Sequence, residues 1–266
     1  MKTLIFYAAF VVVLIMMSSC EKVIEYELNE SSSRYVIEGS ISDQAGNCRV
    51  KVSKSTNFTE SNNFPVVNSA LVTITDNNGN KTELIETEPG IYSSSTLKGY
   101  PGNTYTLRVS VGNETFTGTS TMPEPVPFDS IAFSKINAIG GSKKVPVPVY
   151  NDPENKSNYY RFIEKVNGEK LDAVFVRDDV VTNGRTVRQP LFDFSDESAE
   201  TGDEIEIVMM CIDAKVYEYF FSLSQVTGGG GPNQTGTPAN PVSNLSGNAL
   251  GYFSAHTQQV KKIVVP

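Results

Sequence analysis

Tryptophan is absent from the 266 residues, and histidine occurs once, as His256. Only three cysteines are present, at positions 20, 48 and 211, and they are far apart in the sequence. Zinc sites are built from clustered Cys and His ligands, so the composition excludes an obvious one. Histidine is also the usual base for Ser and Cys nucleophiles, and no Gly-x-Ser-x-Gly motif is present. We therefore predict a protein that is not an enzyme and has neither metal nor cofactor.

Basic residues are the minority among the charges. The chain carries 22 Lys and Arg against 30 Asp and Glu, a net charge of −8. Nucleic-acid binding rests on Lys and Arg contacts to phosphates, so we expect no nucleic-acid partner.

Long hydrophobic runs are also scarce. The only prominent one, residues 4–17, has 14 residues, fewer than the roughly 20 that span a bilayer.

The N-terminus has the pattern of a bacterial lipoprotein precursor. Lys2 precedes the apolar run, and Ser18 and Ser19 precede Cys20. Small residues before a cysteine admit the lipoprotein signal peptidase once the thiol has received its diacylglycerol. We predict that residues 1–19 are a signal peptide and that Cys20 is the site of lipidation. Two or more acyl chains hold a protein firmly on a membrane, so residues 20–32 are expected to be a lipidated tether.

The other two cysteines belong to apolar, strand-like stretches in different predicted domains. Export would permit a disulfide between Cys48 and Cys211. Their separation favours two buried free thiols, with pairing as the alternative.

Residues 33–122 predict an immunoglobulin-like β-sandwich, because short alternating runs are separated by turn signals. Ile37 and Ile41 share one face of the first run, and Leu107 and Val109 share one face of a later run. The Asn-Gly pair ending at Gly79 is typical of a tight hairpin. The first half of the chain is therefore expected to be all-β.

Three prolines within residues 123–127 predict a semi-rigid linker, because proline cannot donate to a strand ladder. Residues 128–266 then predict a β-rich sandwich or barrel with one short helix. Asp213 is expected to cap that helix, and aromatic residues all round it suggest that it is largely buried. Pro146 and Pro148 indicate an edge strand, and residues 250–255 and 262–265 are expected to be closing strands.

Carboxylates cluster in residues 193–204 and at Asp178 and Asp179. Calcium takes six to eight oxygen ligands, and paired carboxylates such as Asp193 and Asp196 can hydrolyse glycosides. Neither alternative has its loop signature, so a solvated acidic loop is the favoured interpretation. His256 is interpreted as a surface or structural histidine.

Several short motifs, in a fixed order, resemble those of the Bacteroidota lipoproteins grouped as domain of unknown function 4249. The motifs are Tyr35-Val36-Ile37-Glu38-Gly39, Pro89-Gly90-Ile91-Tyr92, Asn151-Asp152-Pro153, Asn158-Tyr159-Tyr160-Arg161 and Asn248-Ala249-Leu250-Gly251-Tyr252-Phe253. Such lipoproteins are typically encoded beside TonB-dependent outer-membrane receptors, and the family brings no catalytic residues. The resemblance implies an outer-membrane accessory partner of such a receptor in nutrient uptake, on the periplasmic or the cell-surface face. A free-standing surface lipoprotein that binds a glycan or a protein, as an adhesin does, is the alternative.

Overall fold

The computed structural model describes residues 33–56, 64–138, 141–192, 199–227 and 240–266. Residues 33–266 form one compact unit, distinct from residues 1–32. The predicted signal peptide, Cys20 and the tether therefore lie outside the described residues. Within the described part, no helix has the length and apolar character needed to cross a bilayer.

Strands are the dominant secondary structure of the described residues, which confirms the predicted all-β fold with one helix in the second half. In chain order the elements are β1 (Tyr35–Ser42), β2 (Cys48–Lys54), β3 (Leu71–Asp76), β4 (Lys81–Glu83), β5 (Ile85–Glu88), β6 (Ile91–Ser94), β7 (Thr104–Val111), β8 (Glu114–Thr121), β9 (Phe128–Ala138), β10 (Gly141–Asn151), β11 (Tyr159–Val166), β12 (Glu169–Lys170), β13 (Phe175–Asp178), β14 (Thr186–Arg188), β15 (Glu204–Ile212), α2 (Ala214–Thr227) and β16 (Leu250–Val264).

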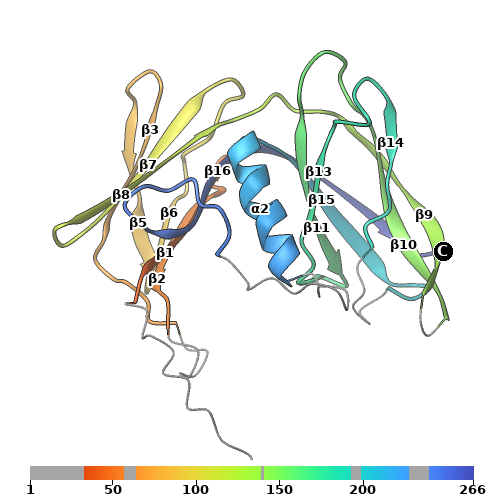
Figure 1. Ribbon diagram of the computed structural model, residues 1–266, viewed down its shortest axis with the longest axis horizontal. Coiled ribbons are helices and arrows are strands. Elements are labelled where there is room, and N and C mark those ends of the chain that lie inside the picture. Colours follow the sequence, from red (N-terminus) through yellow and green to blue (C-terminus); the bar gives the residue numbers. More distant parts are fainter. Residues whose placement is uncertain (1–32, 57–63, 139–140, 193–198, 228–239) are drawn as a thin grey trace, which may run out of the picture. The chain divides into compact units, whose positions relative to one another are not determined.

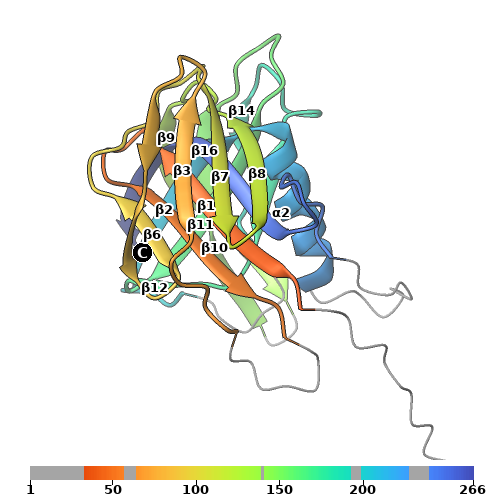
Figure 2. The same ribbon diagram turned by 90° about the vertical axis from the view of Figure 1, so that its left-hand side faces the viewer.

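The first sandwich packs the sheet β4-β3-β7-β8 against β5, β6, β2, β1 and the first half of β16 (Figure 2). The predicted alternation is confirmed, because Ile37, Ile41 and Leu107 are fully buried in its core. Gly79 follows the β3 to β4 turn with φ of 86°, a conformation that glycine adopts without strain.

The second sandwich packs β14-β10-β9 against β15, β11, β12, β13 and the second half of β16. Tyr150 and Tyr160 lie in its core with ring centroids 4.7 Å apart. Strand β10 lies between β9 and β14, so the prediction of an edge strand is wrong for the strand as a whole. Pro146 and Pro148 pair with β9 on one side, while the ladder to β14 covers only residues 149–151. Their missing N–H groups therefore interrupt no ladder.

Strand β16 departs from the predicted division into two separate domains. Its first half pairs in parallel with β1, and its second half pairs antiparallel with β15. One strand of 15 residues thus replaces the two predicted closing strands. The linker at residues 123–127 separates two hydrophobic cores, but one sheet continues through both sandwiches. The prolines in residues 123–127 indicate where the chain leaves the first sandwich. They do not predict that a later strand, β16, pairs again with the first sandwich.

Helix α2 covers the outer face of the second sandwich and lies beside β13 and β11 (Figure 1). Val216 and Phe220 pack there against outward-facing residues of β15, among them Met210. The expectation that the helix is largely buried is wrong in part, since only Val216, Tyr219 and Phe220 are buried and Phe221 is 47% exposed. Sheet and helix meet on one side only, so the opposite face of the helix stays in solvent.

Candidate functional site

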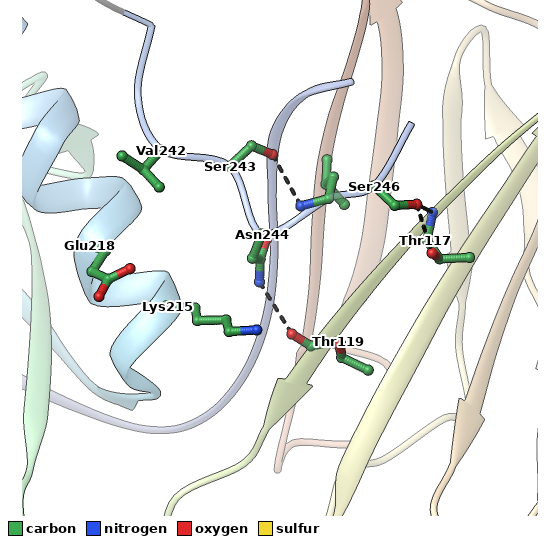
Figure 3. Close-up of a pocket in the computed structure, with 9 residues that line it drawn as sticks. Thr117, Thr119, Lys215, Glu218, Val242, Ser243, Asn244 and Ser246 are labelled. Atoms are coloured by element: carbon green, nitrogen blue, oxygen red, sulfur yellow. Dashed lines mark hydrogen bonds between the residues drawn. The ribbon is translucent and has the colours of Figure 1, made fainter. Parts of the chain in front are cut away.

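A groove runs along β8 and past the start of α2. It consists of three adjoining hollows of about 430, 420 and 310 Å³ that share lining residues. Strand β8 forms one wall, and the first turns of α2 form the other. Residues 242–246 cross the first hollow (Figure 3). We call this feature the β8 groove.

Strand β8 supplies its wall through a strict alternation of residue types. Phe116 and Ser120 point into the core of the first sandwich, whereas Thr117, Thr119 and Thr121 point outward. This follows from the period of two in a strand. Because β8 pairs only with β7 in its sheet, it is an edge strand.

Residues 243–246 lie along the edge of β8 like a short added strand. Leu245 and Gly118 form an antiparallel bridge, and the Ser246 N–H donates to the Thr117 carbonyl over 2.7 Å. The amide of Asn244 donates to the carbonyl oxygens of Thr119 and Phe253. A Cβ at Gly118 would lie 2.6 Å from a methyl carbon of Leu245, so a larger residue there would displace the Leu245 side chain.

Asp213 joins the two sandwiches at the floor of the groove. Its Oδ1 accepts the Val216 N–H at 2.9 Å, which confirms the predicted helix cap. Its Oδ2 accepts hydrogen bonds from the Ser120 hydroxyl and the Thr121 N–H. The Ser120 oxygen in turn accepts the Ala255 N–H at 2.9 Å. One carboxylate thus ties the start of α2 to β8 and, through Ser120, to β16.

Few polar side chains of the groove are available to a ligand. The Thr117 hydroxyl is bonded to Ser246 and the Thr121 hydroxyl to Thr104. By contrast, Lys215, Glu218 and the Thr119 hydroxyl contact no hydrogen-bonding or ionic partner within the described part of the chain. The groove therefore offers Lys215, Glu218 and the Thr119 hydroxyl close to a strand edge, while Glu124 and Lys156 line its third hollow.

The sequence-predicted sites are not brought together. Cys20 and residues 193–198, which include Asp193 and Asp196, lie outside the described residues. In the described end of the acidic segment, the Asp203 carboxylate accepts hydrogen bonds from Asn167 and the Glu200 N–H. No group of three potential metal ligands occurs within the described ranges. Asp178 accepts a hydrogen bond from the Tyr217 hydroxyl, and the buried Asp179 accepts one from the Asn158 N–H.

His256 is a buried structural residue. Its Nδ1 lies 3.1 Å from the Ser254 hydroxyl, and burial together with the charge of Arg161 lowers its pKa to about 4. The favoured prediction for the cysteines is confirmed, because Cys48 and Cys211 are both free and buried. Burial raises the pKa of Cys48 to about 12 and also raises the pKa of Cys211.

Sequence reasoning missed the β8 groove. The available signal was the run of residues 115–121, in which threonine occupies every second position. That pattern predicts a strand with one hydroxyl-bearing face, and nothing in it indicates that α2 lies opposite.

Comparison with known proteins places the chain in a family without assigning an activity. No curated protein matches it. Among solved structures, a segment of two fibronectin type III domains from chicken tenascin is similar at 14% identity and a TM-score of 0.22, covering 67% of this chain and 90% of that chain. A family model described as "Domain of unknown function (DUF4249)" matches residues 21–262. The chain therefore belongs to the DUF4249 family.

Proposed function

We propose that this chain is a non-enzymatic lipoprotein of the bacterial outer membrane and an accessory partner of a TonB-dependent receptor in nutrient uptake. The observation that carries the proposal is the N-terminal sequence, in which Cys20 follows two serines and an uncharged run of 14 residues. The motifs shared with Bacteroidota lipoproteins support the receptor partnership. Acyl chains on Cys20 would hold the acidic protein on the membrane.

The length of chain after Cys20 supports a function close to the membrane. Strand β1 begins at Tyr35, and at most about 3.5 Å per residue is available to the intervening chain. The first sandwich is thereby held within about 50 Å of the bilayer surface. The first sandwich can therefore contact a receptor in the same membrane.

Affinity purification from detergent-solubilised outer membranes tests the proposal. The full-length chain carries a tag after Pro266 and is compared with a Cys20→Ala chain exported by a cleavable secretion signal. We expect the wild-type protein to recover a TonB-dependent receptor at least about tenfold above the soluble form, since only the lipidated protein shares its membrane. Recovery of no receptor with the wild type would contradict the proposal.

A free-standing binding role is the second candidate, and the β8 groove favours it. Its walls carry hydroxyls and charges of both signs, as the recognition of a polar ligand requires. Binding of the purified lipoprotein to a glycan array, together with no receptor in the purification, would support this candidate over the first.

A further inference from the structure

Residues 64–71, which lead into β3, form an uncharged segment at the surface of the first sandwich. Three of its apolar side chains are about half exposed: Phe64 by 51%, Val66 by 48% and Leu71 by 49%. None of the three belongs to a hydrophobic core of the described residues. Single exposed apolar residues are common, but several in one uncharged segment favour a binding surface. We call residues 64–71 the apolar segment.

Hydrogen bonds place the apolar segment beside the point where the tether enters. The folded unit begins at Ser33, whose hydroxyl donates to the Ser55 carbonyl at 2.8 Å. The Ser55 N–H donates in turn to the Arg34 carbonyl. The next residue back, Lys54, donates its N–H to the Pro65 carbonyl at 2.8 Å. The start of β1, the end of β2 and the apolar segment therefore lie at one end of the first sandwich (Figure 2).

This end of the sandwich is the one to which the predicted lipid anchor is attached. Cys20 lies 13 residues before Ser33, so the chain between them spans at most about 45 Å. Strand β1 then carries the chain about 25 Å away over its eight residues. Tyr100 marks the opposite end, because the adjoining Gly99 N–H donates to the carbonyl of Ser42, the last residue of β1.

Charged groups lie on both sides of the apolar segment. The Lys54 Nζ lies over the Tyr35 ring, 5.0 Å from its centroid, close to the tether entry. On the other side, the Glu86 carboxylate accepts the N–H groups of Gly90 and Ser69, and these bonds lower its pKa. Glu86 is therefore ionised and hydrated at neutral pH, which limits how deeply the segment can enter an apolar phase. A lysine beside exposed apolar groups suits the level of lipid phosphates, where its stem stays apolar and its ammonium hydrated.

We propose that Phe64 and Val66 insert into the interface of the bilayer that holds the lipid anchor, with Lys54 at the level of the phosphates. The partner of the apolar segment is thus a lipid surface. Interfacial binding scales with the apolar area that is buried, so two side chains bind weakly by themselves. The tether makes the contact intramolecular and raises the effective concentration of the bilayer. This inference rests on the proposed function, which supplies the lipidation of Cys20.

A fluorophore on the apolar segment tests the contact. Val66→Cys is labelled with nitrobenzoxadiazole in the lipoprotein purified from membranes, where Cys48 and Cys211 are buried. The protein is then reconstituted into vesicles of phosphatidylethanolamine and phosphatidylglycerol. Tyr100→Cys is the matched control, since Tyr100 is 59% exposed at the opposite end of the same sandwich. We expect nitroxide-labelled lipids to quench the label at position 66 at least about threefold more than the label at position 100. Aqueous iodide should show the reverse order.

A charge in the apolar segment separates insertion from mere proximity to the membrane. In the labelled Val66→Cys protein, Phe64→Glu should lower the quenching by nitroxide lipids to the level of the Tyr100→Cys control. Ile85→Glu is the matched substitution, because Ile85 is apolar, 73% exposed and outside the segment. It should leave the quenching within about 1.5-fold. Equal effects of the two substitutions would overturn the inference.

The inference and the proposed function fail in different ways. If the protein stays with the vesicles but iodide quenches positions 66 and 100 equally, the insertion is wrong and the lipid anchor stands. Protection of position 66 from both quenchers would also overturn the insertion and would point to a second copy of the chain over the segment. If the protein does not float with the vesicles, the proposed lipoprotein function is wrong and the insertion is wrong with it.

Discussion

The carboxylate of Asp213 accepts a hydrogen bond from the hydroxyl of Ser120, which lies 93 residues earlier in the chain. The same carboxylate caps α2, and Ser120 also accepts the Ala255 N–H of β16. Strand β8 of the first sandwich, the shared strand β16 and the start of the helix therefore meet at one partly buried polar junction. This junction fixes the wall of the β8 groove against its opposite side.

Replacement of Asp213 by alanine should destabilise the folded unit. The substitution removes the helix cap, worth about 1 kcal/mol, and two partly exposed hydrogen bonds, worth about 0.5–1.5 kcal/mol each. We expect a loss of about 2–4 kcal/mol in the free energy of unfolding, measured by urea denaturation of the purified lipoprotein. Glu218→Ala, on the exposed face of the same helix, is the control and should stay within about 0.5 kcal/mol. Equal effects would show that the junction does not stabilise the fold.

The parallel pairing of β1 with β16 depends on glycine at position 251. Gly251 has φ of 98°, and a Cβ there would lie 2.0 Å from the carbonyl oxygen of Ile37. Gly251→Ala should therefore cost more than about 4 kcal/mol or prevent folding, because a backbone overlap adds to the strain of a positive φ.

Gly79→Ala is the matched control for that substitution. Gly79 also has a positive φ, of 86°, but its Cβ would meet nothing within 4 Å. It should cost only the strain of a left-handed residue, about 1–2 kcal/mol. A Gly251→Ala protein as stable as Gly79→Ala would contradict the shared-strand topology.

Stability should fall in mild acid because of His256. Burial lowers its pKa from 6.5 to about 4. As the pH drops from 6.5 to 4, the unfolded chain binds a proton that the folded chain does not, so the free energy of unfolding falls. The full effect is about 3 kcal/mol, and it is complete below pH 4. His256→Gln should show a shallower decline than wild type over this range. If the free energy of unfolding falls equally with pH in wild type and His256→Gln, a buried neutral His256 is excluded.

Thiol titration gives a further prediction. Cys48 and Cys211 are free and buried, and burial raises the pKa of each. The native lipoprotein should therefore be almost unreactive toward Ellman's reagent at pH 8, since the thiolate is the reactive form. In denaturant it should release two equivalents of thionitrobenzoate per chain, because the proposed diacylglyceryl thioether blocks the Cys20 sulfur. Three equivalents would mean that the Cys20 thiol is free.

Local patterns predicted those parts of the fold that local interactions decide. Leu107 and Val109 alternate with polar residues because one face of β7 is buried, and Gly79, between β3 and β4, has a positive φ that glycine accepts. Asp213 was recognised as a cap because the cap bonds are made within one helical turn. The donors to its Oδ2, Ser120 and Thr121, lie in β8, and the sequence around position 213 does not predict them.

Long-range pairing accounts for what the sequence left unpredicted. The partnership between Ile37 and Gly251 joins segments from opposite ends of the chain, and no periodicity specifies which strand a run of apolar residues will join. The β8 groove was missed for the same reason. Thr119 and Lys215 come from different sandwiches and become neighbours only once β16 and Asp213 have joined them.

Mass spectrometry of the N-terminal peptide of the protein purified from membranes tests whether the protein is a lipoprotein. We expect a chain that begins at Cys20 and carries the mass of a diacylglyceryl group and its acyl chains on that residue. A chain that begins at Met1, or an unmodified Cys20, would contradict it.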